Sequence, residues 1–173
     1  ESIKINTRAD VPLALSLSGG LDSSILMSLG VKKKIFNKNP NCYSVIFGDD
    51  FSERDYINES TDLYKFKSNF INFSKEEFKK SINPMIWSLE SPSGGLMNCA
   101  LAKLCHQIKR DNYKIVLDGT GLDEGFGGYE LHHLKYLAKL QNGNKKKFNF
   151  ALKLFSLNWK ISEQKILDKL NSL

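Results

Sequence analysis

Apolar and polar positions follow a strand-then-helix order over most of this 173-residue chain. Short apolar runs bounded by turn residues are typical of buried strands, so the sequence predicts four strands, over 11–17, 42–47, 70–73 and 113–117. Between them, mixed apolar and polar segments predict helices from about 21 to 31, 52 to between 64 and 67, 74 to 87 and 97 to 110. Strands that alternate with helices indicate a parallel sheet with helices on its faces, and hence an α/β fold.

Local signals mark where two of these helices begin. Ser52 is the expected N-cap of the second helix, with Glu53 and Asp55 in its first turn, where carboxylates favour the positive end of the helix dipole. Ser74 and Glu77 form a capping-box pattern for the third helix. Proline has no backbone N–H and disturbs a helix interior, so Pro84 is expected to kink or divide that helix.

The last segment, 130–173, has leucines and aromatic residues at helical spacing, with breaks near 142–144 and near Asn158. We expect a nucleotide-binding domain over 1–140 and a helical extension over 141–173 that packs on it, so that the whole forms one domain. The chain begins Glu1-Ser2 without an initiator methionine, and we expect it to be a piece of a longer protein.

The turn after the first apolar run carries the clearest chemical signal. Gly19 and Gly20 allow close approach of the backbone to an anion, and the following helix directs the positive end of its dipole to the same place. Three hydroxyls add donors, and Asp22 places a carboxylate where Mg²⁺ could bridge it to a phosphate. The turn therefore predicts a Mg²⁺-nucleotide site built from 17–24; a glycine-rich turn without a ligand is the alternative.

A second glycine-rich stretch, 118–129, follows the fourth predicted strand and reads D-G-T-G-L-D-E-G-F-G-G-Y. Ligands of open α/β sheets bind outside the carboxyl ends of the strands, so both stretches can face one ligand. Asp123 and Glu124 could act on that ligand, or could be helix N-terminal carboxylates that only stabilise the next helix. The kinase-type P-loop is excluded, because no lysine follows the second glycine of the first turn.

Composition adds three limits. The net charge of +6 suits a nucleotide or an acidic substrate and does not require nucleic acid. Three cysteines without a C-x-x-C pair indicate neither a disulfide framework nor a zinc site, which fits the cytoplasm. No apolar run approaches the length of a membrane span, and no signal-peptide pattern opens the chain, so we expect no membrane partner.

The motif S-G-G-L-D-S-S, together with L-D-G-T-G-L-D-E-G-F-G-G-Y, resembles the synthetase domain of glutamine-dependent asparagine synthetases, within the ATP pyrophosphatases. The resemblance covers about 11–140 and places Glu53 in the family's Asp-Glu pair and Glu90-Ser91-Pro92 in its Glu-Pro loop. It implies a Rossmann-like fold of the adenine nucleotide alpha hydrolase type, with ATP and Mg²⁺ as ligands. It also implies an acid activated as an acyl-adenylate with release of pyrophosphate, followed by attack of ammonia or an amine.

The same resemblance implies roles for individual residues. Asp22 and Asp123 would hold Mg²⁺ and, with Glu124, would form the catalytic set. ATP would lie between two groups of contacts. The pyrophosphate would contact Ser18, Gly19, Gly20, Asp22, Ser23 and Ser24, whereas the adenine, ribose and α phosphate would contact Leu17, Val45, Phe47, Gly119, Thr120 and Gly121.

Three departures from the family pattern leave the acceptor open. Thr120 replaces a glutamate between the two glycines of the second motif, Asp118 replaces a serine, and Ser52 replaces an aspartate. Three alternatives follow. The acid is aspartate, or it is another acid such as a sugar or peptide carboxylate, or the chain is a nucleotide-binding module without turnover. Ammonia would come from a glutaminase domain or another source outside this chain. We expect a small carboxylate as the second substrate and a homo-oligomer, and we do not expect nucleic acid as a partner.

Overall fold

A computed structural model describes residues 1–36, 40–48, 53–92, 95–141 and 143–172. Within these ranges the chain forms two compact units, Glu1–Gly119 and Thr120–Leu173. The division falls inside the second glycine-rich stretch, not at residue 140. In the described residues, no helix is both long and apolar enough to cross a membrane.

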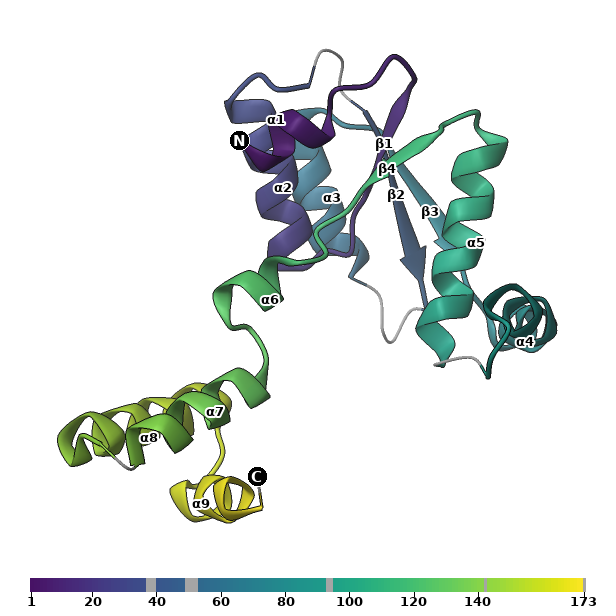
Figure 1. The fold of residues 1–173 in the computed structure, drawn as a ribbon. Coiled ribbons are helices and arrows are strands. Elements are labelled where there is room, and N and C mark those ends of the chain that lie inside the picture. The colour runs from purple at the N-terminus through teal and green to yellow at the C-terminus, as the bar shows by residue number, and fades with distance from the viewer. Residues whose placement is uncertain (37–39, 49–52, 93–94, 142, 173) are drawn as a thin grey trace. The chain divides into compact units, whose positions relative to one another are not determined.

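The first unit is a parallel sheet between two layers of helices (Figure 1). Its four strands, in the order β3-β2-β1-β4, are β1 (Leu13–Ser16), β2 (Asn41–Ile46), β3 (Ser68–Asn72) and β4 (Ile115–Leu117). Every pair is parallel, with Leu15 opposite Cys42 and Leu117, and Ser44 opposite Phe70. The predicted strands and the α/β fold are therefore confirmed, with each strand starting or ending within a few residues of its predicted bounds.

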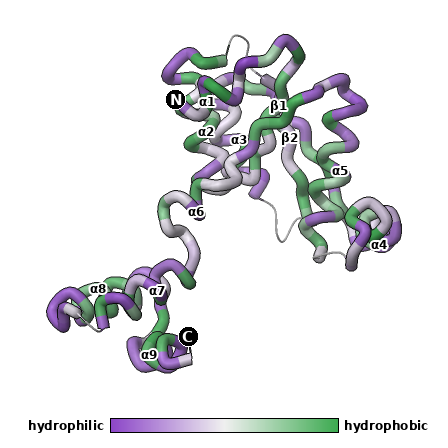
Figure 2. The backbone as a smooth tube through the Cα atoms, in the orientation of Figure 1, coloured by the Kyte–Doolittle hydropathy of each residue, from purple (hydrophilic) through white to green (hydrophobic). Residues whose placement is uncertain are grey.

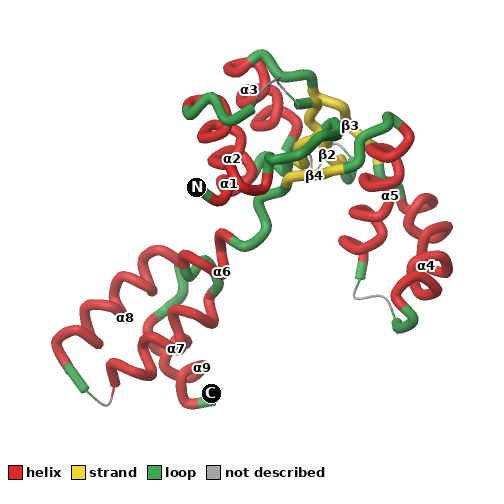
Figure 3. The backbone as a smooth tube through the Cα atoms, turned by 45° about the horizontal axis from the view of Figure 1, so that its top comes forward, coloured by secondary structure: helices red, strands yellow, loops and turns green. Residues whose placement is uncertain are grey.

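One face of the sheet is covered by α2 (Leu21–Lys32) and α3 (Arg54–Tyr64). The core on this face joins alternate strand residues to the two helices. Its fully buried side chains include Leu15 and Cys42 from the strands, Met27 from α2 and Ile57 from α3. The other face is covered by α5 (Leu96–Arg110), through Leu104 and Ile108, with α4 (Lys75–Leu89) beside α5. The yellow strands in Figure 3 lie between these red helical layers.

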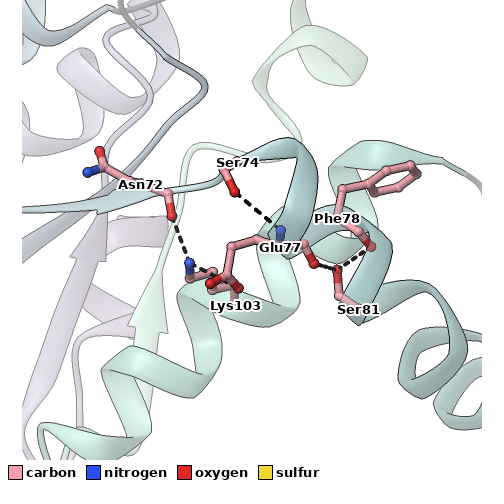
Figure 4. A network of polar contacts seen from close by, with 6 residues as sticks. All are labelled: Asn72, Ser74, Glu77, Phe78, Ser81 and Lys103. Carbon is pink, nitrogen blue, oxygen red and sulfur yellow. Dashed lines mark hydrogen bonds and ion pairs between the residues drawn. The ribbon is translucent and has the colours of Figure 1, made fainter.

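Polar contacts fasten α4 to α5 and to the end of β3 (Figure 4). Lys103 Nζ on α5 donates to the carbonyl of Asn72 at 2.7 Å and lies 3.3 Å from the Glu77 carboxylate on α4. The predicted N-cap Ser74 accepts from the Glu77 N–H at 3.2 Å. Pro84 lies inside α4 without dividing it, so that part of the prediction is wrong: the buried Met85 packs against α5 and holds the turn beyond the proline in place.

Other element ends depend on single backbone conformations. Lys65 ends α3 in the left-handed region with a φ of +56°, so that helix stops at Tyr64. The predicted N-cap Ser52 lies outside the described residues. A short helix that the pattern did not predict, α1 (Ser2–Asn6), precedes β1. Figure 2 shows β1 as a hydrophobic, green segment, as expected for a strand covered on both faces.

The second unit begins with the short helix α6 (Leu122–Phe126) and continues as α7 (Glu130–Gln141), α8 (Lys145–Trp159) and α9 (Glu163–Asn171). Leu137, Phe155 and Ile166 form part of the apolar core between the last three helices. Both predicted breaks are present, and the Asn144 and Ser162 side chains cap the helices that follow them. Helix α7 thus packs with α8 and α9, although the sequence analysis assigned 130–140 to the nucleotide-binding domain.

The three cysteines differ in burial, and this gives a testable consequence. Cys42 and Cys99 are fully buried and Cys105 is exposed. Burial raises the pKa of Cys42 to about 12, so that thiol stays protonated and unreactive at neutral and mildly alkaline pH.

We therefore expect an aromatic disulfide reagent to modify one thiol rapidly in the native protein and the other two only on unfolding. The fast phase should disappear in Cys105→Ser. Rapid reaction of two or three thiols in native protein, or a fast phase that survives Cys105→Ser, would contradict the buried positions of Cys42 and Cys99.

Candidate nucleotide site

The turn between β1 and α2 is an internally hydrogen-bonded loop. The Ser23 hydroxyl lies 3.2 Å from the Ser18 hydroxyl and 3.3 Å from both the Ser18 N–H and the Gly20 carbonyl. The Ser18 hydroxyl also accepts from the Gly20 N–H at 3.2 Å. Ser23 is buried, whereas Ser18 is exposed. The buried hydroxyl therefore organises the loop from within, and the exposed one is available to a ligand.

Helix α2 begins at this loop, and no side chain in the described part of the chain caps its N-terminus. The N-cap is Gly20, in an extended conformation, while the Ser24 hydroxyl turns back to the Gly20 carbonyl at 2.9 Å. Asp22 lies in the first turn and is half-buried. An uncapped helix N-terminus beside a glycine turn is a site where backbone N–H groups can bind an anion.

Two glycines bring other segments against this loop. Gly19 has a φ of +79°, and a Cβ there would lie 2.8 Å from the Glu53 Cβ, next to the start of α3. A Cβ on Gly119, just beyond β4, would lie 2.9 Å from the Ser23 nitrogen and 3.0 Å from the Asp22 Cβ. The distances of 2.8 Å at Gly19 and 2.9 Å at Gly119 are too short for real Cβ atoms, so each contact requires glycine. The structure thus places the start of the second motif against the first turn of α2.

The residues expected around adenine divide between the two faces of the sheet. Leu17 is buried in the core beneath α2 and α3. Val45 and Phe47 pack on the α4–α5 side, where the Phe47 ring meets Phe73 edge-on at 5.9 Å. The Leu17 N–H donates to the Tyr43 carbonyl at 2.9 Å, which holds the two strand ends side by side. The backbones of β1 and β2 are therefore adjacent, whereas the Leu17 side chain packs in a different core from those of Val45 and Phe47.

Within β2 lies a buried hydroxyl, Ser44, to which the sequence alone gave no role of its own, although the resemblance places the segment 44–47 at the adenine site. Ser44 is almost completely buried, and its Oγ has no hydrogen-bond partner in the described part of the chain. The sequence feature that could have identified Ser44 is a polar residue inside an otherwise apolar strand. The residues of the Glu-Pro loop lie elsewhere: Glu90, Ser91 and Pro92 line a hollow with Trp87 at the end of α4.

In the second unit, the residues of the second motif form their own cluster around α6. Asp123 and Glu124 occupy its first turn. In this position carboxylates can stabilise the helix, which is one of the two roles considered for them in the sequence. The Tyr129 hydroxyl donates to the Glu124 carboxylate at 2.9 Å, and the His132 ring meets Tyr129 edge-on. The pKa of the Glu124 carboxyl lies below its ordinary value because backbone N–H groups, its own first, and the Tyr129 hydroxyl stabilise the ionised form.

Asp123 is positioned by a glycine. Its main-chain carbonyl accepts from the Gly128 N–H at 2.8 Å, and a Cβ on Gly128 would lie 1.9 Å from the Asp123 carboxylate. The carboxylate therefore occupies the space that a side chain at 128 would fill. Gly121 and Gly127, on either side of α6, both have positive φ. Thr120 is exposed at the beginning of this unit.

The donor set fits ATP and Mg²⁺ in part. The loop of 18–24 supplies hydroxyls and an uncapped helix N-terminus for phosphate, and Asp22 and Asp123 are carboxylates of the type that Mg²⁺ prefers. Among the described residues, no group of three or more His, Cys, Asp or Glu side chains could hold a metal ion.

Comparison with known proteins gives matches over nearly the whole chain. The family model of asparagine synthase matches residues 1–172. A putative glutamine-hydrolyzing asparagine synthetase 2 from Methanocaldococcus jannaschii is 32% identical over 133 residues, which cover 76% of this chain and 25% of that protein. The glutamine-hydrolyzing asparagine synthetase 1 of Bacillus subtilis is 29% identical over 151 residues, which cover 84% of this chain and 23% of that protein. The chain thus spans about a quarter of the length of these relatives.

A solved structure of similar arrangement is the predicted subunit of tRNA methyltransferase from Methanocaldococcus jannaschii. It has a TM-score of 0.42 and 23% sequence identity, and the match covers 84% of this chain and 74% of that one.

The close approach at Gly119 gives a prediction for stability. A methyl group in Gly119→Ala would collide with backbone atoms of α2, which cannot rotate away, so we expect the free energy of unfolding in urea to fall by about 1–3 kcal/mol. Gly125→Ala is the control, because nothing lies within 4 Å of a Cβ there. That change should be neutral or stabilise the protein by up to about 1 kcal/mol. Equal stability of Gly119→Ala and the parent would show that β4 and α2 do not meet as described.

Proposed function

Because the chain belongs to the asparagine synthase family, we propose that it is the ATP-binding part of an enzyme that forms an amide from a carboxylic acid. Proteins of this family use ATP for that purpose. In the proposed reaction a carboxylate oxygen of the acid attacks the α phosphorus of ATP, and the bond to the β phosphate breaks. Pyrophosphate leaves, and ammonia or an amine then attacks the acyl carbon and displaces AMP.

The observation that carries this proposal is the contact between Gly119 and the first turn of α2. It joins the start of the second motif to the loop that follows β1, at the carboxyl edge of a parallel sheet, where such sheets bind ligands. In the proposal, the N-terminus of α2 and the Ser18 hydroxyl bind the β and γ phosphates. In the same proposal, the α phosphate and ribose contact Gly119, Thr120 and Gly121.

The adenine would be recognised mainly by backbone groups. The Leu17 and Val45 side chains lie on opposite faces of the sheet and pack in separate cores, so in the proposal they would contact the base from its two sides at the edge of the sheet. Their strands end at the same edge of the sheet, and in the proposal backbone groups beyond Leu17 and Phe47 would contact the edge of the base.

Asp22 and Asp123 are the proposed ligands of Mg²⁺, which would neutralise the charge that develops on the departing pyrophosphate. Asp22 is supported by its place in the first turn of α2, and Asp123 by its place over Gly128. Glu124 would accept hydrogen bonds from the substrate or its amine in the ionised state that its lowered pKa favours. Its hydrogen bond from Tyr129 would set its orientation.

Aspartate is the proposed acid. A sugar or peptide carboxylate is the alternative, because Thr120 and Ser52 depart from the family pattern. The names of the similar synthetases include glutamine hydrolysis. Ammonia would accordingly come from a glutaminase domain or another source outside these residues.

The reaction is tested by measuring pyrophosphate and AMP in the presence of ATP, Mg²⁺, ammonium and one acid at a time. We expect both products to form in equal amounts, only when an acid is present, and to be lost in Asp123→Asn. A fall of about 10²-fold or more is expected for this substitution, by analogy with the removal of one charge-stabilising group.

The choice of acid decides among the alternatives. Activity with aspartate alone indicates asparagine synthesis, and activity with a different acid indicates the alternative amidation. Acid-independent release of phosphate, or no product with any acid although ATP binds, would contradict the proposed ligase reaction. The parent chain and Asp123→Asn should have the same circular dichroism spectrum, since Asp123 is exposed.

A further inference from the structure

The amino edge of the sheet, opposite to the nucleotide edge, carries two hollows that join. One, of about 230 Å³, is lined mainly by apolar residues, among them Val11, Leu13 and Ile35. The other, of about 770 Å³, is lined by Lys4, Arg8, Lys33 and Lys34 with one carboxylate, Asp10. Thr7, Ala9 and Ile35 line both, so an apolar hollow opens directly into a strongly basic one.

The fold explains why these residues meet. In a parallel sheet all strands start at one edge, and the helices that cross back end there. The C-terminus of α2 and the helix α1 both reach this edge, and α1 lies beside α2 (Figure 1). In Figure 2 the segment after α2 changes from hydrophilic purple to hydrophobic green.

Basic residues at helix C-termini stabilise the helix dipole, but this does not account for the whole set. Lys4 and Arg8 extend the basic hollow from a separate element, and no carboxylate in the described ranges forms an ion pair with Lys4, Arg8, Lys33 or Lys34. More positive side chains lie near the starts of the strands or at the helix ends of this edge, namely Lys32, Lys65, Lys67, Lys109, Arg110 and Lys114.

We propose that this edge binds an acidic polypeptide segment that inserts one aliphatic or aromatic side chain into the apolar hollow. The four cations provide charge complementarity for flanking Asp or Glu residues, which speeds and orients association. The hollow beside them receives the inserted side chain, and a buried anchor of this kind contributes much of the affinity of an interface. The site is independent of the proposed ligase reaction, because it lies at the other end of the strands.

The lining of the apolar hollow favours a polypeptide over a nucleic acid. Single-stranded nucleic acids are bound through aromatic side chains on which successive bases stack. Here the lining residues are aliphatic apart from Thr7 and Phe36, and Phe36 is half-buried and packs edge-on against Phe66 at 6.3 Å. A leucine side chain suits such a lining, and a base does not.

The proposal is tested with labelled oligoglutamate peptides that carry one central leucine or one central serine, and with an oligouridylate of equal charge. We expect the leucine peptide to bind several-fold more tightly than the serine peptide and the oligouridylate, with an affinity that falls as salt is raised. The triple variant Lys4→Glu, Arg8→Glu, Lys33→Glu should weaken binding at least tenfold, and the corresponding glutamine variant should weaken it less. All three residues are exposed, so the fold should persist, which circular dichroism checks.

The matched control is Lys145→Glu, Lys146→Glu, Lys147→Glu, which changes the net charge equally at a distant place in the sequence. It should reduce binding less than twofold. Equal weakening by both triple variants would overturn the proposal, because it would show attraction to net charge alone. Equal affinity for the leucine and serine peptides, tighter binding of the oligouridylate, or no binding of any probe would also overturn it.

Discussion

The structure depends on close approach of main chains at the carboxyl edge of the sheet, which only glycine permits. Gly19 lies against the start of α3, and Gly119 against the first turn of α2. With a side chain at either position the loop after β1 would have to move away from its neighbours. These contacts gather the ends of β1 and β4 and the starts of α2 and α3 in one place. The N-terminus of α2 remains uncapped there, and this is what makes the site suitable for phosphate.

The sequence predicts much of this arrangement because the signals are local. Apolar runs separated by helical segments predict a parallel sheet, and the glycine-rich stretches follow the strands whose carboxyl ends bind ligands. The hydroxyls of Ser18 and Ser23 were correctly placed in one turn. The order of the strands depends on which helices cross which face. A pattern of alternating elements leaves that order open, so contacts such as Gly119 with Asp22 could not be derived from it.

Side-chain direction and tertiary packing explain what the sequence leaves open. Of the residues that the resemblance places around adenine, Leu17 packs beneath α2 and α3 and Val45 packs on the α4–α5 side, because successive residues of a strand point to opposite faces of the sheet. Pro84 does not divide its helix, which tertiary packing of Met85 keeps as one element. The short helices α1 and α6 have too few residues to show helical periodicity, and α6 lies in a stretch that glycines mark as a loop.

The two edges of the sheet differ in the chemistry that they present. The carboxyl edge has backbone donors, hydroxyls and carboxylates, which suit a phosphate with a metal ion. The amino edge has exposed cations beside an apolar hollow, which suit an acidic polypeptide. A parallel sheet produces this division directly, since helix N-termini collect at one edge and helix C-termini at the other. Four of the chain's basic residues, Lys4, Arg8, Lys33 and Lys34, thus line the hollow at the amino edge, away from the proposed nucleotide.

The central claim is that the loop after β1 binds the phosphates of ATP through its backbone and through a metal ion held by Asp22. The most direct measurement is a calorimetric titration of the chain with ATP, with and without Mg²⁺, for the parent and for Asp22→Asn. The account predicts that ATP binds in the presence of Mg²⁺, binds much more weakly without it, and binds weakly to Asp22→Asn under both conditions. Absence of binding, or binding that neither Mg²⁺ nor the substitution affects, would contradict it.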